Sequence, residues 1–309
     1  MTHELWHADI DVNDSIVSQC LDRQFPKLKP ISLKCIDEGW DNKIYLVNDK
    51  LIFRFPRREI AVQLLERENV VLNYLYDKVN ISIPNPTYIG EPSDIYPYPF
   101  HGYPFIEGVS GSHAELSDEN RIASIPALAS FLKTLHSIGE EEAIALGAKP
   151  QVFDRTKVGN IAQQFNERIE KLISRGIATF DLSQVDAELR KAFAVKLPID
   201  NKVLVHGDLY CRHLLFNQNE LTGIIDWGDV GINSPACDLM VVFSFYPEHC
   251  HDEFFALYGE VESNTRQYAR FLGLYSAISV MVYGHDIGDQ VLVNESLGAI
   301  KRINSMLLI

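Results

Sequence analysis

The sequence predicts an α+β protein of two lobes, a small β-rich N-terminal lobe and a large helical C-terminal lobe. Roughly the first third of the chain holds short apolar runs between turn residues, whereas the later segments place apolar residues at helical spacing. A connector rich in proline and glycine, Gly102-Tyr-Pro-Phe-Ile-Glu-Gly108, separates the two regions. With 309 residues, 46% of them hydrophobic, the chain is long enough to build a core in each lobe.

The small lobe is expected to begin with a helix. Asn13 and Asp14 can cap this helix, and Pro26 ends it. Three strands should follow, joined by turns at 38–42 and 48–50, and then a helix that packs on their sheet. We place the strands at residues 31–36, 43–47 and 51–56, and the second helix at residues 60–76.

Two further extended stretches follow Ile83-Pro-Asn-Pro86 and lead to the connector. We therefore divide the chain into an N-terminal lobe with its leading helix (1–102), a hinge (103–108) and a C-terminal lobe (109–309). The helices of the C-terminal lobe are expected at residues 121–136, 157–175, 186–193, 250–258, 264–283 and 292–306.

The most informative stretch is Leu204-Val-His206-Gly-Asp208-Leu-Tyr-Cys-Arg212-His213, followed by Ile224-Ile-Asp226-Trp-Gly228. In the catalytic loop of protein kinases, an aspartate stands two residues after a histidine, and a metal-binding asparagine stands five residues later. Asp208 and position 213 fit this spacing. The apolar runs 214–216 and 221–225 predict a hairpin that brings Asp226 beside Asp208. One carboxylate would take the proton of an attacking hydroxyl, and the other would hold Mg²⁺.

These motifs, H-G-D-x-x-x-x-[NH] and I-I-D-W-G, resemble those of the aminoglycoside phosphotransferase family, a small-molecule branch of the protein-kinase-like fold. The resemblance covers about residues 31–305 and is most specific between 204 and 239. Asn233-Ser-Pro-Ala-Cys-Asp238-Leu is similar to the D-P-A-x-D-L segment of that family, with Ser234 replacing its first acid. The resemblance implies a bilobed kinase-like fold and a structural role for Asp238.

The resemblance also implies roles at the catalytic segment. Asp208 would accept or orient the acceptor hydroxyl, and Arg212 would neutralise Asp208 or touch a phosphate. Asp226 and His213 would bind Mg²⁺. Imidazole nitrogen is a poor ligand for Mg²⁺, so the number of metal ions stays open. Macrolide kinases and the aminoglycoside kinases that modify the 2″-hydroxyl are similar in carrying His at this place.

The nucleotide, ATP or GTP, is expected at the N-terminal lobe. Gly39 and Asn42 belong to the turn where kinase-like folds cover the nucleotide, although one glycine makes this a weak signal. Arg54 stands on the third strand where kinases carry a phosphate-binding lysine. Arg57 and Arg58 are the alternatives for that role.

Glu68, on the helix after the third strand, is the expected partner of Arg54, with Glu66 as the competitor. The connector should offer main-chain N–H and C=O groups to the purine. Pro104 cannot donate a hydrogen bond, so we expect those contacts at Tyr103 and Phe105.

The acceptor is predicted to be a small cationic molecule. Acidic residues outnumber basic ones by 42 to 28, for a net charge of -14, which disfavours nucleic acid and suits a polyamine. An acidic surface kept for solubility explains the charge equally well. The acids expected at the acceptor are Asp229, Glu248 and Asp252.

Together these features predict an ATP- or GTP-dependent O-phosphotransferase that modifies an aminoglycoside. If the acceptor is not an aminoglycoside, a macrolide is the next alternative, followed by a sugar or an amino alcohol. An inactive kinase-like binding protein is the alternative of another functional class. The five cysteines are scattered and form no C-x-x-C pair, which suits reduced thiols. No run is long and apolar enough for a membrane span, so we expect a cytoplasmic protein without a membrane partner.

Overall fold

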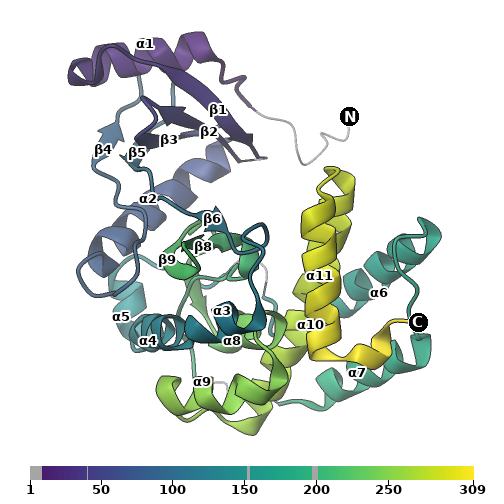
Figure 1. Ribbon diagram of the computed structural model, residues 1–309. Coiled ribbons are helices and arrows are strands. Elements are labelled where there is room, and N and C mark those ends of the chain that lie inside the picture. Colours follow the sequence, from purple (N-terminus) through teal and green to yellow (C-terminus); the bar gives the residue numbers. More distant parts are fainter. Residues whose placement is uncertain (1–8, 40, 152–153, 197–200) are drawn as a thin grey trace. The chain divides into compact units, whose positions relative to one another are not determined.

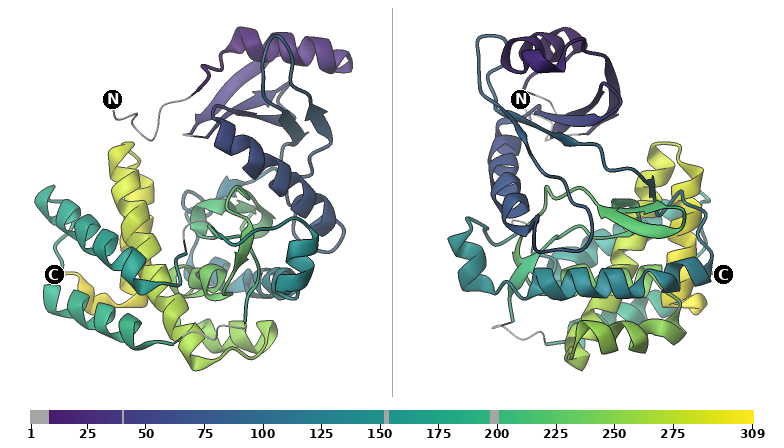
Figure 2. Two further views of the ribbon diagram at one scale, coloured as in Figure 1. Left: turned by 180° about the vertical axis from the view of Figure 1, so that it is seen from behind. Right: turned by 60° about the vertical axis from the view of Figure 1, so that its left-hand side comes forward.

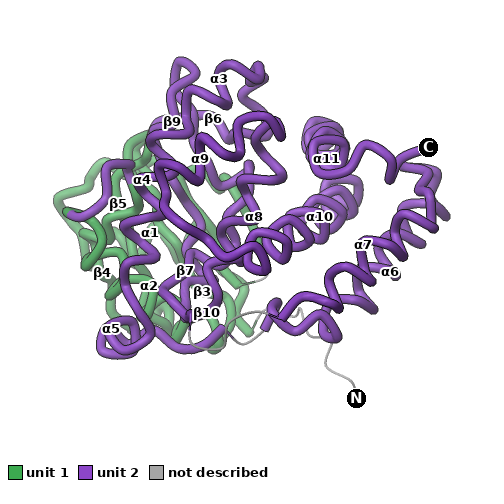
Figure 3. The backbone as a smooth tube through the Cα atoms, turned by 90° about the horizontal axis from the view of Figure 1, so that it is seen from below, with its two compact units in different colours: residues 1–77, 83–106 green, residues 78–82, 107–309 purple. Residues whose placement is uncertain are grey.

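The computed structural model describes residues 9–39, 41–151, 154–196 and 201–309. The chain forms two compact units, which Figure 3 shows in different colours. Unit 1 comprises Met1–Asp77 and Ile83–Ile106, and unit 2 comprises Lys78–Ser82 and Glu107–Ile309.

Unit 1 is built on an antiparallel sheet of five strands in the order β1-β2-β3-β5-β4. Its helix α1 begins at the predicted cap, where the Asn13 side chain accepts a hydrogen bond from the Ile16 N–H at 3.1 Å. The elements of unit 1 are α1 (Asp14–Gln24), β1 (Leu33–Glu38), β2 (Asn42–Val47), β3 (Leu51–Pro56), α2 (Glu59–Leu75), β4 (Tyr88–Gly90) and β5 (Phe100–Pro104).

The two faces of this sheet serve different purposes. Phe53 and Phe55 of β3 join Leu21 of α1 in a core of fully buried side chains. Arg54, between them in the sequence, points to the opposite face, where it forms an ion pair with Glu68 of α2. Figure 2 shows α1 and α2 on either side of the strands.

Unit 2 is mainly helical (Figure 1). Its longest helix, α10, has 24 residues and packs against α6, α8 and α11. The helices are α3 (Asp118–Ala123), α4 (Ile125–His136), α5 (Glu140–Ala145), α6 (Val158–Ser174), α7 (Leu182–Ala194), α8 (Ala236–Phe245), α9 (His251–Tyr258), α10 (Ser263–Asp286) and α11 (Gln290–Ile303). The strands are β6 (Val109–Ser110), β7 (Val203–Val205), β8 (Leu214–Asn217), β9 (Glu220–Ile224) and β10 (Gly231–Asn233).

Two differences from the predicted helices have physical reasons. The single helix expected at 121–136 is two helices, because α3 ends at Ser124 and Pro126 occupies the first turn of α4. Helix α8 was not predicted as a helix. Nine of its ten residues are buried, so it has no polar face and no apolar period that could identify it.

Of the helices within the described ranges, none combines enough length with enough apolar character to cross a membrane. The five cysteines are free thiols, of which Cys35 is exposed and Cys20, Cys237 and Cys250 are buried.

Candidate active site

The catalytic segment lies in unit 2 between β7 and the hairpin β8–β9. The two strands pair in antiparallel register from Leu214 opposite Ile224 to Asn217 opposite Glu220, which confirms the predicted hairpin. Gln218 and Asn219 form the turn with φ of 49° and 68°. The returning chain is tied to the outgoing one, because the Ile225 N–H donates to the His213 carbonyl at 3.0 Å.

This hairpin brings Asp208, His213 and Asp226 together. The His213 Nδ1–H donates to the Asp208 carbonyl at 2.7 Å, and Nδ1 lies 3.8 Å from Asp208 Oδ2. On the other side of the ring, Nε2 lies 3.4 Å from Asp226 Oδ2. In the neutral ring the Nδ1 hydrogen bond leaves a lone pair on Nε2. Both carboxylates therefore lie beside one imidazole, as the spacing predicts.

Asp226 has a backbone conformation that few residues adopt. Its φ of 65° is left-handed, which costs an L-residue free energy unless its surroundings hold it there. Two buried neighbours do so. The Trp227 indole N–H donates to the Ile224 carbonyl at 3.1 Å, and the Trp227 ring lies 4.7 Å from that of His206.

Asp238 of α8 holds the loop that carries Asp208. Its carboxylate is fully buried and accepts from the N–H of His206 at 2.7 Å and of Gly207 at 2.8 Å. His136 Nε2 lies 3.1 Å from it. Burial alone would raise the pKa of Asp238, but the hydrogen bond from His136, the charge of the histidines and the Gly207 N–H lower it. Asp238 thus has the structural role that was expected.

His206 and Gly207 shape the loop. The His206 Nε2–H donates to the Ile225 carbonyl at 3.0 Å, and burial lowers the pKa of this histidine, which favours its neutral form. Gly207 has a φ of 87°, and a Cβ there would stand 1.9 Å from the Gln151 side chain. This position therefore requires glycine.

Arg155 contacts Asp208. Both of its terminal nitrogens lie 3.4 Å from Asp208 Oδ1, and Nη1 also donates to the Gly207 carbonyl at 2.8 Å. Burial opposes its charge, but the carboxylates of Asp208 and Asp229 raise the pKa of Arg155. The sequence did not reveal this contact, because 53 residues separate its partners. The predicted Arg212 instead lies with its guanidinium 5.2 Å from the centre of the Tyr283 ring.

Asp229 also belongs to this cluster. Its Oδ2 lies 3.7 Å from Arg155 Nη2. Partial burial and the neighbouring Asp208 raise the pKa of Asp229 to about 6, against the opposing effect of Arg155. Among the described residues, no group of three or more His, Cys, Asp or Glu side chains is arranged to hold a metal ion.

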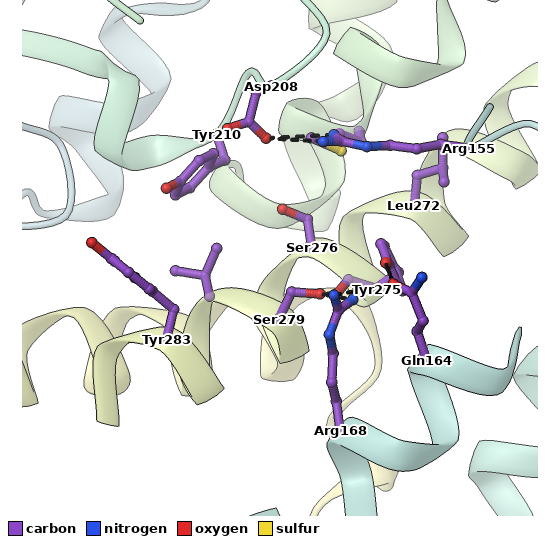
Figure 4. A pocket seen from close by; sticks show the side chains of 12 residues that line it. Arg155, Gln164, Arg168, Asp208, Tyr210, Leu272, Tyr275, Ser276, Ser279 and Tyr283 are labelled. Carbon is purple, nitrogen blue, oxygen red and sulfur yellow. Dashed lines mark hydrogen bonds and ion pairs between the residues drawn. The ribbon is translucent and has the colours of Figure 1, made fainter. Parts of the chain in front are cut away.

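Asp208 faces a cavity of about 430 Å³ that lies wholly within unit 2 (Figure 4). Its walls come from α6 and the chain just before it, from α8, from α10 and from the catalytic loop. The predicted acids Glu248 and Asp252 do not line it. Both are exposed, and the Asp252 side chain is 100% accessible on α9, which packs against α4. Their expected place at the acceptor therefore stays a prediction that the lining of this cavity does not support.

The predicted pair Arg54 and Glu68 is present in unit 1, joined at 2.6 Å between two buried side chains. The alternative arginines are engaged in the turn after β1. Arg57 lies 3.0 Å from Glu38, and Arg58 lies 3.0 Å from Asp41. Neither therefore competes with Arg54 for the place on the sheet face toward α2.

The other predicted nucleotide contacts are also in unit 1. The Gly39 N–H donates to the Asn42 carbonyl at 3.0 Å, and the buried Asn42 Oδ1 accepts no hydrogen bond from the described residues. Trp40 of the same turn lies outside those residues. Tyr103 pairs with Ile52 across the sheet. The Phe105 N–H donates to the Lys50 carbonyl at 2.8 Å, so the sheet, rather than a purine, uses that donor.

Comparisons with known proteins agree with this geometry. Residues 32–272 match the sequence model described as "Phosphotransferase enzyme family". A solved structure of APH(2″)-IIIa with GDP and kanamycin is 26% identical, with a TM-score of 0.67 over 94% of this chain and 98% of that chain. A macrolide 2′-phosphotransferase type I is 19% identical, with a TM-score of 0.59 over 93% of this chain and 98% of that chain. These likenesses confirm the predicted fold class.

One curated relative is viomycin phosphotransferase of Streptomyces vinaceus. It is 29% identical over 108 residues, which are 34% of this chain. The match spans 38% of the length of that relative.

Proposed function

Because the chain belongs to the phosphotransferase enzyme family, we propose that it transfers the terminal phosphoryl group of a nucleoside triphosphate to a small-molecule hydroxyl. One observation carries this proposal. Asp208 and Asp226 lie on either side of the His213 ring, and Asp208 also faces a cavity large enough for an acceptor. Its volume of about 430 Å³ falls within the range of roughly 300–1,000 Å³ that is typical of small-molecule sites.

Asp208 is proposed to accept the proton of the acceptor hydroxyl, or to orient that hydroxyl toward the phosphate. General base catalysis of this kind contributes about 10²- to 10⁴-fold in rate. Arg155 holds the Asp208 carboxylate and the Gly207 carbonyl at once, which fixes the direction of the base. Phosphoryl transfer depends mainly on such positioning.

Mg²⁺ is proposed to bind at Asp226 and His213. This ion is usually held by one or two carboxylates together with the phosphates of its nucleotide, so a small set of protein ligands fits it. Asp226 Oδ2 and His213 Nε2 stand 3.4 Å apart, close to the spacing of about 3 Å between adjacent ligands of one such ion. When bound, Mg²⁺ neutralises charge on the phosphate oxygens.

The nucleotide is proposed to contact unit 1 through Arg54, which Glu68 orients. A guanidinium forks onto two phosphate oxygens, and a buried carboxylate partner keeps it in one direction. Gly39, Asn42, the main chain at Tyr103 and the carbonyl of Phe105 are proposed as further contacts, since the Phe105 N–H already donates to the Lys50 carbonyl. GDP is bound in the structure of APH(2″)-IIIa, so GTP stands beside ATP as a phosphoryl donor.

The comparisons favour an aminoglycoside antibiotic as the acceptor. Kanamycin is bound by APH(2″)-IIIa, and viomycin phosphotransferase is named for another antibiotic. Macrolides, sugars and amino alcohols remain the alternatives. Asp229 is the one predicted acceptor acid that lies beside Asp208 and Arg155.

The proposal is tested by nucleotide turnover. Purified protein is given ATP or GTP with Mg²⁺ and a panel of aminoglycosides, macrolides, sugars and amino alcohols. We expect at least one acceptor to stimulate turnover, and Asp208→Asn and Asp226→Asn each to reduce it by about 10² or more. Asp252→Asn, at a fully exposed position, is the matched control. Turnover in the wild type no greater than in Asp208→Asn, with every acceptor, would instead support an inactive binding protein.

A further inference from the structure

The cavity beside Asp208 differs in charge from the chain as a whole. Although the net charge of the protein is -14, Arg155, Arg168 and Asp208 are the only charged residues among the described ones that line this cavity. Arg155 is compensated by Asp208 and Asp229. These two carboxylates and the two arginines sum to zero, so the cavity and its edge are close to neutral. Arg168, however, has only neutral hydrogen-bond partners, Ser279 and Gln164, among the described residues.

Arg168 is held in place by neutral groups. It rises from α6, donates from Nη1 to Ser279 Oγ at 2.6 Å and donates from Nη2 to Gln164 Oε1 at 3.2 Å. Its guanidinium lies 4.7 Å from the centre of the Tyr275 ring, and the Tyr275 hydroxyl donates to the same Gln164 oxygen at 2.7 Å. Figure 4 shows the side chain pointing into the cavity.

This arrangement leaves the guanidinium able to bind a ligand. Among the ion pairs of the described residues, none includes Arg168. A guanidinium has five N–H donors, and its two hydrogen bonds to Ser279 and Gln164 use only part of them. A fixed, planar donor without a carboxylate partner is suited to a carboxylate or phosphate, which it can bind in a bidentate manner.

The same charge disfavours a polyamine. An ammonium group beside Arg168 would meet a positive charge, while Asp208, the lining acid among the described residues, is already paired with Arg155. The remaining walls offer neutral hydroxyls and aromatic rings, among them Tyr210, Ser276 and Tyr283. Aromatic rings and hydroxyls suit a neutral polyol ring.

We infer that the acceptor carries an oxyanion, a carboxylate or a phosphate, which binds Arg168 while a hydroxyl of the same molecule faces Asp208. This inference rests on the proposed function, because it takes Asp208 as the residue that meets the acceptor. Among the acceptors named above, it selects a sugar that carries an acid group, whereas the comparisons favour an aminoglycoside.

The test compares four molecules that share one ring and differ in charge. Binding of glucose, glucosamine, glucuronate and glucose 6-phosphate to the full chain is titrated by ligand-observed NMR. We expect glucuronate or glucose 6-phosphate to bind at least about tenfold more tightly than glucosamine, and the stronger of the two identifies the oxyanion. Arg168→Gln should abolish this preference. Arg175→Gln is the matched control and should keep the preference, because Arg175 follows the end of α6 and pairs with Asp286.

A second variant guards against misfolding of Arg168→Gln. Ser276→Asp leaves Arg168 intact and adds a carboxylate to the cavity wall, so it should shift the preference toward glucosamine. The inference is overturned if neither anion binds saturably, if glucosamine or kanamycin binds more tightly than both anions, or if Arg168→Gln keeps the preference. Nucleotide turnover is measured separately. Its absence would defeat the proposed phosphotransferase, while the order of binding would still decide the charge preference of the cavity.

Discussion

At the scale of single residues, the position of Asp208 depends on Arg155. The arginine contacts the carboxylate and the preceding carbonyl together, so it restrains both the side chain and the main chain of the loop. Its own main chain is fixed, because the Tyr268 hydroxyl donates to the Arg155 carbonyl at 2.7 Å. We therefore propose that Arg155 is a positioning residue for Asp208.

We expect Arg155→Gln to lower kcat by about tenfold to 10²-fold, because a displaced base is aligned less well with the acceptor hydroxyl. The KM for the nucleotide should change little. Arg155→Lys should have a higher kcat than Arg155→Gln, since lysine keeps the positive charge but lacks the planar pair of N–H donors of a guanidinium. Steady-state kinetics with the best acceptor checks this, with Arg190→Gln at an exposed position of α7 as the control. A loss confined to nucleotide KM would contradict the role.

The residues that the sequence could identify are those whose partners are close along the chain. Asp208 and His213 are five residues apart on one loop, and Asp226 follows after a single hairpin, so spacing alone placed them together. The contact between Arg155 and Asp208 spans 53 residues, and no short pattern marks it. The role expected of Arg212, to neutralise Asp208 or touch a phosphate, stays a prediction.

At the scale of elements, α8 anchors the catalytic loop to the core of unit 2. Asp238 near its start accepts two main-chain N–H groups of the loop, and the rest of the helix is enclosed by its neighbours. Buried carboxylates that accept several hydrogen bonds contribute strongly to stability, because the donors would otherwise be left unsatisfied. A helix without an amphipathic pattern thus supports the most polar loop of the protein.

For Asp238→Asn we expect a decrease of about 2–3 kcal/mol in the free energy of unfolding. The new amide places a donor against the N–H of His206 or Gly207, which leaves one hydrogen bond broken in a buried place. Urea denaturation of the variant, followed by a signal from unit 2, checks this. Asp252→Asn, at an exposed position, is the control. Equal denaturation midpoints for the two variants would show that the hydrogen bonds to Asp238 contribute little.

Strands and helices with clear periodicity were predicted well, and those that depend on three-dimensional context were not. The alternation of Phe53, Arg54 and Phe55 located β3 and both of its faces. The short strands β6, β7 and β10 have two or three residues each, too few for a period to be recognised. Their pairing depends on distant segments of the chain.

At the scale of the whole molecule, the net charge does not describe the charges at the cavity beside Asp208. The excess of acids is spread over the surface, where Glu248 and Asp252 belong, while the cavity at Asp208 contains two arginines. A charge sum averages over solvent-exposed groups that no ligand touches. The chemistry of an acceptor is therefore better inferred from the walls of one cavity.

Nucleotide with Mg²⁺ should stabilise the whole protein. A ligand present at 100 times its Kd adds about 2.7 kcal/mol to the free energy of unfolding, so we expect the Tm to rise on addition of either Mg²⁺-ATP or Mg²⁺-GTP. Asp226→Asn should lose most of the rise that depends on Mg²⁺, because it removes one proposed ligand of the ion. Differential scanning calorimetry with and without a chelator checks this. The same rise in Asp226→Asn as in the wild type would place the ion elsewhere.

The distribution of the cysteines should allow one thiol to be labelled selectively. Burial raises the pKa of Cys20 to about 11 and that of Cys211 and Cys237 to about 12, and it also raises the pKa of Cys250. Alkylating reagents attack the thiolate, so these four sulfur atoms are protected. Cys35 on β1 is the exposed exception. A maleimide dye should therefore attach at one site, giving a fluorescent reporter on unit 1 without prior removal of the other thiols.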